Sequence, residues 1–265
     1  MPVIIAHGQP KSGSTFLFRT VCEAISQVEG QEFYSLWASL MGQGVNVYFE
    51  TVTPEDLGRL TERAGERTVV IKTHAALSDD VREMVERGDV RAFTSFRDPR
   101  DACRSMLDAG ISDREKGSTR WFATKTKSSE LVRPIAYQCR MLQSWMNCPK
   151  VLALPYYLIA NDQDYTVRRL CDHLGFSGIG HLVSTHMDET KASVPEYHKG
   201  ISDRFLEDFN WPEIEFLNKA LAPEIAQYEK HLLPRMEEFG HQSLCAQLIH
   251  MRDERLRQLE SEQAA

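Results

Sequence analysis

The sequence predicts an α/β fold in which helices flank a central parallel sheet. Short runs of β-branched and apolar residues recur along the first two thirds of the chain, and segments with helical periodicity separate them. Strands and helices that alternate in this way form parallel sheets with helices on both faces. The sequence shows no repeat, low-complexity linker or break in composition. We therefore expect residues 1–265 to form one domain, helical from about residue 203.

Composition narrows the classes of function that are open. The chain has 42% hydrophobic and 26% charged residues, which is typical of a globular protein with a sizeable core. Its net charge is −7, so we expect no general affinity for nucleic acid or anionic membranes, and an anion site would need a local cluster of donors.

Cysteine spacing and hydropathy predict where the protein resides. The six cysteines form no C-x-x-C pair and no metal-ligand spacing, so we expect small core residues in a reducing compartment. No run approaches 18 apolar residues, which predicts no membrane span. We therefore expect a cytoplasmic protein that needs no metal.

The first predicted strand, residues 3–6, leads into the stretch Pro-Lys-Ser-Gly-Ser-Thr-Phe at residues 10–16 and a helix to about residue 28. A strand, a turn rich in Gly and Ser and a helix N-terminus form a common phosphate site. Unpaired N–H groups and about half a positive charge from the helix dipole point at the ligand there. Lys11 would add a full positive charge. A tight turn with a solvated lysine is the alternative.

Gly8 and Gly13 have the G-x-x-x-x-G spacing of nucleoside-triphosphate loops, but the match is incomplete. Ser14 stands where such a loop has its lysine, and the lysine lies three residues earlier. The loop therefore resembles a triphosphate loop in general form only.

The remaining elements follow in order. Runs of β-branched residues predict strands at 68–72, 90–96 and 150–154, and helical periodicity predicts helices at 78–88, from 98 onward, and at 131–146, 165–174 and 243–258. Residues 178–203 are expected to be rich in loops. Aromatic residues at 31–60 without a clean period fit an acceptor pocket or core packing under a loop, and the basic stretch 112–130 is expected to be a loop or lid.

Two further motifs directly follow predicted strands, where parallel sheets gather their ligands. Lys72-Thr73-His74 places a histidine that can act as a general base near neutral pH, or a hydrogen-bonded structural residue. Arg97 opens the second motif, in which Asp98 is a good N-cap and Pro99 suits the first helical position. A well-capped surface helix is its simpler explanation.

Together the loop, the Lys-Thr-His triplet and the spacing from Arg97 to Ser105 resemble sulfotransferases, of the cytosolic and bacterial small-molecule type, that use 3′-phosphoadenosine 5′-phosphosulfate (PAPS). The resemblance implies that His74 is the base and that Lys11 and Lys72 stabilise charge on the sulfuryl group. It also implies a 5′-phosphate cradle and a 3′-phosphate site. The implied cradle is Ser12, Gly13, Ser14 and Thr15, and the implied 3′-phosphate residues are Arg97 and Ser105.

Weaker matches extend the resemblance to about residue 205. Tyr156 is similar to a tyrosine that contacts adenine, as are Thr185 and Met187 by a looser alignment. Phe16 stands where a tryptophan usually lies against adenine. His198-Lys199-Gly200 looks like the Arg-Lys-Gly that closes over the 3′-phosphate, but His198 replaces the arginine and the Gly-Asp-Trp that often follows is absent. These departures affect closure over the donor more than the chemistry.

The expected activity is transfer of a sulfuryl group from PAPS to a hydroxyl, or an amine, of a small-molecule acceptor, with 3′-phosphoadenosine 5′-phosphate (PAP) as product. Alternatives are a nucleoside-triphosphate kinase of the same fold class, which the lysine position disfavours, and a non-catalytic nucleotide-binding protein. Aromatic residues at 33–49 and 121–122 would suit an apolar acceptor, whereas Lys125 and Lys127 would suit an anionic one. The last helix could dock on its own domain or on a second subunit of a homodimer.

Overall fold

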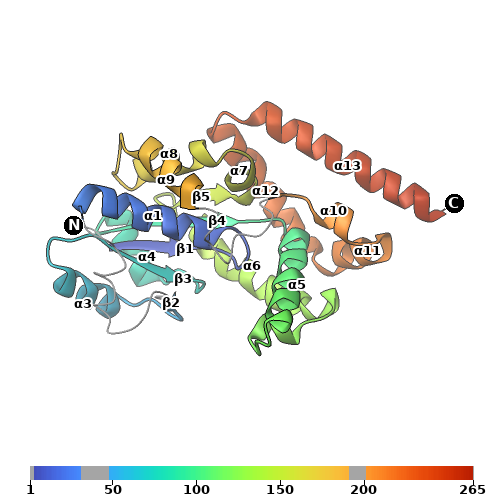
Figure 1. Ribbon diagram of the computed structural model, residues 1–265, viewed down its shortest axis with the longest axis horizontal. Helices are drawn as coiled ribbons and strands as arrows, with labels where there is room; N and C mark the ends of the chain where they lie inside the picture. The colour runs from blue at the N-terminus through green and yellow to red at the C-terminus, as the bar shows by residue number, and fades with distance from the viewer. Residues whose placement is uncertain (1–2, 31–47, 191–200, 265) are drawn as a thin grey trace. The chain divides into compact units, whose positions relative to one another are not determined.

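The five strands form one parallel sheet within the residues that the computed structural model describes, which are 3–30, 48–190 and 201–264. The strands lie side by side in the order β2-β3-β1-β4-β5, and each neighbouring pair is parallel (Figure 1). They are β1 (Val3–His7), β2 (Tyr48–Phe49), β3 (Val69–Thr73), β4 (Val90–Phe96) and β5 (Leu152–Pro155). The predicted α/β fold with a parallel sheet is confirmed.

Contacts divide the chain into two compact units. The sheet unit comprises residues 1–96 and 140–200, and the helical unit comprises residues 97–139 and 201–265. Helix α6 (Val132–Met146) runs from one into the other. The expected single domain stays a prediction.

In the sheet unit, β1 is the central strand. Val3 is paired with Val69 on one side and Val90 on the other, and every residue of β1 is buried. A strand covered on both faces needs a continuous apolar run, which the sequence supplies in β1 and in β3. The strands predicted at 3–6, 68–72, 90–96 and 150–154 therefore form within two residues of their predicted bounds.

The helices of the sheet unit connect its strands. Ser78 caps α4 and Gly88 ends it, as the sequence predicts. Helices α1, α8 and α9 pack against one another (Figure 1). The helices are α1 (Ser14–Glu29), α3 (Pro54–Ala64), α4 (Asp79–Arg87), α7 (Tyr156–Asn161), α8 (Gln163–His173) and α9 (Gly180–Thr190).

The sequence prediction did not include helices α3, α7 and α9. Helix α3 begins inside the stretch that showed no clean period, because Thr53 and Asp56 form a capping box and Leu57 and Leu60 are buried. Helix α9 occupies 180–190, so the expectation of loop there is wrong. Its buried stripe is narrow in a polar segment, and packing against α1 and α8 supplies the stability that periodicity did not reveal.

The helical unit has its own core. Buried residues from α5, α6, α10 and α11 meet there, among them Cys103, Ile135, Phe205 and Leu217. All six cysteines are buried and free of disulfide bonds. Besides the first part of α6, the elements of the unit are α5 (Pro99–Glu115), η1 (Trp121–Thr124), η2 (Ser128–Glu130), α10 (Phe205–Asp208), α11 (Trp211–Ala220), α12 (Ala222–Glu238) and α13 (Gln242–Ala264).

Candidate functional site

The loop between β1 and α1 is fastened to the end of β4. The N–H of Gln9 donates to the Ser95 carbonyl at 3.1 Å. The Ser12 hydroxyl is fully buried, 2.7 Å from the Ser95 hydroxyl and 2.5 Å from the Gln9 carbonyl oxygen. Ser12, predicted to cradle phosphate, therefore contributes its hydroxyl to the shape of the loop.

Backbone geometry keeps this loop narrow. A Cβ atom on Gly8 would lie 2.5 Å from both Ser14 Cβ and Ser95 Oγ, closer than real Cβ contacts allow. Gly13 has φ 84° and forms the N-cap of α1. Lys11 has φ 68°, a left-handed conformation that costs a non-glycine residue on the order of 1–3 kcal/mol. Strain of this kind is typical of loops that bind a ligand.

The start of α1 is suited to an anion. Gly13 provides no side-chain cap, and the first N–H groups of a helix have no acceptor inside it. From the neighbouring strand β3, Lys72 reaches the same turn and donates from Nζ to Thr15 Oγ1 at 2.7 Å. A helix dipole and a lysine thus lie together, which favours phosphate or sulfate.

His74 follows β3 and is joined to the same loop. Its Nδ1 lies within hydrogen-bond distance of the Gly8 carbonyl, a very short contact. Because a carbonyl only accepts, Nδ1 carries the proton and Nε2 keeps its lone pair. Burial, followed by the charge of Lys72, lowers the pKa of His74 to about 4 against the opposing effect of the Gly8 bond. His74 is therefore neutral at pH 7.

The turn that carries His74 is tied to two other elements. The Thr73 hydroxyl donates to the Phe49 carbonyl of β2 at 2.8 Å and accepts from the Ala75 N–H at 3.0 Å. Trp145 of α6 donates from Nε1 to the Ala75 carbonyl at 2.8 Å. These bonds hold the backbone on both sides of His74 in one conformation.

A second histidine, His7, lies at the end of β1 and was not predicted as a site residue. Its ring stacks on Trp145 at 4.7 Å, and its Nδ1 lies 2.7 Å from the Thr94 hydroxyl. Among the described residues its buried Nε2 has no hydrogen-bond partner. Burial, with a smaller contribution from His74, lowers the pKa of His7 well below its usual value. The sequence signal that could have identified His7 is its position at the end of an apolar strand.

The residues predicted to contact adenine lie in different surroundings. Tyr156 begins α7 and lies against the loop, since a Cβ on Gly13 would be 3.3 Å from its ring. Phe16 is half-buried in the first turn of α1. On α9, the exposed Thr185 donates to the carbonyl one turn earlier, and Met187 is buried. The adenine assignment stays a prediction.

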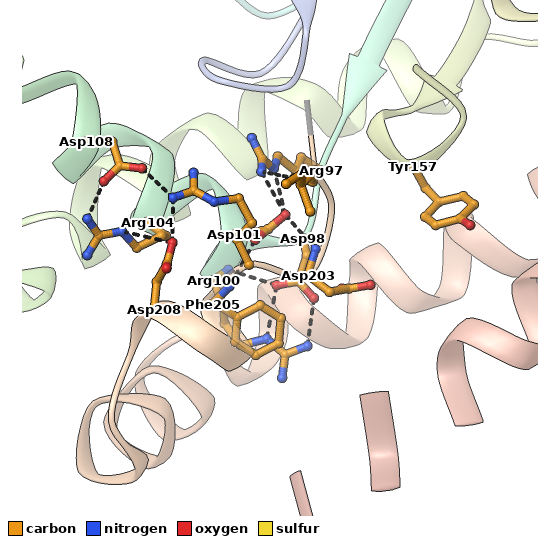
Figure 2. Close-up of polar contacts among 12 residues, drawn as sticks. Arg97, Asp98, Arg100, Asp101, Arg104, Asp108, Tyr157, Asp203, Phe205 and Asp208 are labelled. Carbon is orange, nitrogen blue, oxygen red and sulfur yellow. Dashed lines mark hydrogen bonds and ion pairs between the residues drawn. The ribbon is translucent and has the colours of Figure 1, made fainter. Parts of the chain in front are cut away.

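In the helical unit, Arg97 forms a buried ion pair. Its Nε and one terminal nitrogen lie 2.9 and 2.8 Å from Asp101 Oδ2, and the guanidinium also donates to the Ile201 carbonyl at 3.2 Å (Figure 2). Ser105, predicted with Arg97 to bind the 3′-phosphate, is buried two turns into α5. Their predicted partners His198, Lys199 and Gly200, like the aromatic residues at 33, 34 and 37, lie outside the described residues.

Asp98 caps α5 as predicted and also pairs with Arg100. Its carboxylate accepts from the Arg100 N–H at 2.8 Å and from the guanidinium at 2.6 Å. Burial works against ionisation of Asp98, but the charge and hydrogen bonds of Arg100 outweigh it and lower the pKa of the carboxyl. The arginine also lies 4.2 Å above the ring of Phe205. The ion pair between Asp98 and Arg100 thus has a structural role at the start of α5.

The described residues offer neither a cluster of metal ligands nor a helix suited to a membrane. No group of three or more His, Cys, Asp or Glu there could hold a metal ion. None of the helices in those ranges combines the length and the apolar character that a membrane crossing requires.

Solved structures share this fold. Mouse sulfotransferase SULT7A1 in complex with PAP is 14% identical in sequence and superposes with a TM-score of 0.54. The alignment covers 87% of this chain and 86% of the SULT7A1 chain. Retinol dehydratase in complex with androsterone and the inactive cofactor PAP is 16% identical, with coverage of 84% and 80% and a TM-score of 0.54. No family model matches the chain, and no curated protein matches its sequence. The chain therefore has the fold that these two structures share.

Gly8 offers a test of the loop geometry. We expect Gly8→Ala to lower the free energy of unfolding by about 1–3 kcal/mol, because the added methyl group meets Ser14 and Ser95. Urea denaturation measures the change. The matched control is Gly58→Ala in α3, where no atom lies within 4 Å of the added Cβ, and which should gain about 0.5–1 kcal/mol. Equal effects of both variants would contradict the tight loop.

The low pKa of His74 offers a second test. Lys72→Met removes a positive charge and keeps an apolar stem, so the pKa of His74 should rise from about 4 toward 6.5. It should not reach 6.5, because burial is the larger cause. Histidine ring resonances followed by NMR during a pH titration measure it. Lys116→Met is the control, and an unchanged His74 titration in Lys72→Met would rule out the proximity of the two side chains.

Proposed function

We propose that this chain is a sulfotransferase that transfers a sulfuryl group from PAPS to a hydroxyl of a small-molecule acceptor, with an amine as the second choice of acceptor group. The observation that carries the proposal is the meeting of three features at one edge of the sheet: the loop that contains Lys11, the N-terminus of α1 with Lys72, and the neutral His74. The fold shared with a sulfotransferase and with retinol dehydratase, both solved in complex with PAP, supports it.

The residues present suit the phosphosulfate end of this donor. Gly8 and Gly13 leave the loop backbone open to close approach, and residues 12–15 lead into a helix start without a side-chain cap. Lys11 lies within the loop, and Lys72 reaches it from β3. When bound, the donor supplies the sulfuryl group and a phosphate leaving group. The lysines and N–H groups would neutralise charge there, at about 3 kcal/mol for each well-placed donor.

His74 has the features of a general base. Its Nε2 would accept the proton of the acceptor hydroxyl while the acceptor oxygen bonds to sulfur and the bond from sulfur to the phosphate oxygen breaks. The bond from Nδ1 to Gly8 sets the tautomer, so that Nε2 is ready to accept a proton without a prior rearrangement. Orientation by a backbone carbonyl is a common way to hold such a histidine.

The other proposed contacts to PAPS rest on the resemblance of the sequence motifs to those of sulfotransferases. Arg97 and Ser105, with His198, Lys199 and Gly200, would bind the 3′-phosphate; Phe16, Tyr156, Thr185 and Met187 would contact adenine. Arg97 already forms an ion pair with Asp101. A guanidinium has five N–H donors, so it can bind a carboxylate and a phosphate at the same time. A cytoplasmic location, a homodimer and the acceptor class stay proposals as well.

The first experiment compares the thermal stabilisation of the protein by PAP with that by ADP and magnesium. We expect PAP at about a hundred times its dissociation constant to add about 2.7 kcal/mol to the free energy of unfolding. ADP with magnesium should do much less. Stabilisation by ADP with magnesium alone would overturn the sulfotransferase proposal and favour a kinase.

His74→Asn separates binding from chemistry. The variant should keep the PAP-induced shift in melting temperature and lose at least about a hundredfold in PAPS turnover, measured with phenol, alcohol and amine acceptors. The control is His250→Asn on α13, an exposed histidine outside the proposed site. Full turnover in His74→Asn would remove the base assignment, and absence of turnover in the unaltered protein with every acceptor would favour a non-catalytic nucleotide-binding protein.

Arg97→Gln tests the 3′-phosphate assignment with a matched pair of ligands. We expect the affinity for PAP to fall by about ten- to a hundredfold, because hydrogen bonds to charged groups contribute about 1.5–3 kcal/mol. The affinity for AMP, which lacks the 3′-phosphate, should change much less. Calorimetric titration of both ligands measures the difference. Equal losses for PAP and AMP would show that Arg97 acts only through its structural pair with Asp101.

A further inference from the structure

One carboxylate organises the start of the helical unit. Asp101 accepts hydrogen bonds from the Arg97 side chain, from the N–H of Asp203 at 3.0 Å and from the N–H of Phe205 at 3.2 Å (Figure 2). Arg97 and the N–H of Asp203 share the same oxygen, Oδ2. The first turn of α5 is thereby tied to residues 201–205, and the position of Arg97 depends on both segments.

Asp98, Asp101 and Asp203 are the carboxyl groups of a buried charge network that also contains Arg97, Arg100 and Arg252. Of these three carboxyl groups, Asp203 has no ion pair among the described residues. Asp98 is paired with Arg100 at 2.6 Å, Asp101 with Arg97 at 2.8 Å, and Arg252 of α13 with Glu229 of α12 at 2.9 Å. The backbone of Asp203 has φ 57°, a conformation that aspartate tolerates better than most residues.

The charged and titratable groups that face Asp203 come from three helices. Asp98 and Asp101 of α5 disfavour its ionisation, and Arg100 and Arg252 favour it. Tyr228 of α12 and Cys245 of α13 face it too; burial is the largest cause of the raised pKa of both groups, and the charge of Asp203 adds to it. Burial is the largest cause, and together these effects raise the pKa of Asp203 to about 7. Asp203 therefore exchanges its proton in the physiological range.

We propose that Asp203 is a positioning residue that couples binding of a nucleotide phosphate at Arg97 to the uptake of one proton. The inference rests on the proposed function, because it takes Arg97 as the 3′-phosphate residue. A phosphate at Arg97 brings up to two negative charges next to a network that already holds Asp98 and Asp101. Protonation of Asp203 removes one negative charge from the same place and leaves the N–H bond to Asp101 intact.

Linkage fixes the sign of the effect. If a phosphate favours protonated Asp203, protonation favours the phosphate by the same factor. Affinity is then unaffected well below pH 7 and falls as pH rises above 7, by at most tenfold for each pH unit. The second ionisation of a phosphate monoester, near pH 6, acts in the opposite direction and is nearly complete in that range. A variant that cannot ionise at residue 203 isolates the contribution of Asp203.

The experiment is calorimetric titration of the full chain with PAP at pH 7.0, 7.75 and 8.5, each in two buffers of different ionisation enthalpy. We expect the unaltered protein to bind PAP about fifteenfold less tightly at pH 8.5 than at pH 7.0, and to take up close to one proton at pH 8.5. Asp203→Asn should bind PAP with nearly constant affinity and no proton uptake. Asp80→Asn, an exposed aspartate of α4, should behave as the unaltered protein does.

Each outcome decides the inference. Binding of PAP to the unaltered protein without proton uptake, or proton uptake that survives in Asp203→Asn, overturns the role of Asp203 and leaves the sulfotransferase proposal standing. Failure of PAP to bind at every pH overturns both. If Asp203→Asn does not fold, Asp203→Gly replaces it, since glycine adopts φ 57° without strain. A structural role alone would lower stability and leave the proton count unchanged.

Discussion

One hydrogen bond joins the two strand ends on which the proposed chemistry depends, from His74 Nδ1 to the carbonyl of Gly8. It holds the base against the phosphate loop and selects the tautomer of the imidazole. The loop can present that carbonyl only because Gly8 has no side chain in the space between Ser14 and Ser95. The conformation of the loop and the orientation of His74 therefore cannot vary independently, and Lys72, two residues before His74, reaches the same loop.

In the helical unit, too, one acceptor group joins segments that are distant in the sequence; here it is the Asp101 carboxylate instead of a backbone carbonyl. Asp101 brings together one arginine side chain and two backbone N–H groups, all in a buried position. Buried charges cost free energy unless each is paired and hydrogen-bonded, and loss of one partner leaves the other exposed to that cost. Burial, opposed by the charge of Arg97, raises the pKa of the Asp101 carboxyl. Such a cluster permits few alternative arrangements of residues 97–101 and 201–205.

Local sequence patterns predicted the sheet and the loop but not the contacts between residues that are distant in the sequence. Buried strands need continuous apolar runs, and the Lys-Ser-Gly stretch has a fixed position after the first of them, so both could be found from sequence. Helix α9 was missed because only a narrow stripe of its polar sequence is buried. The ring of His7 stacks on Trp145, and the carboxylate of Asp101 accepts from the N–H groups of residues 203 and 205. These partners are far away in the sequence, so local patterns could not identify them.

The buried cysteines have a practical consequence for work in solution. None of the six thiols is exposed, and burial raises the pKa of Cys103 and of Cys171 to about 12, so thiolate, the reactive form, is scarce at neutral pH. A cysteine introduced at an exposed position such as Trp121 would then react with maleimide dyes or nitroxide labels far faster than the native thiols. One such label on each unit would let fluorescence or electron spin resonance measure their separation without first removing any native cysteine.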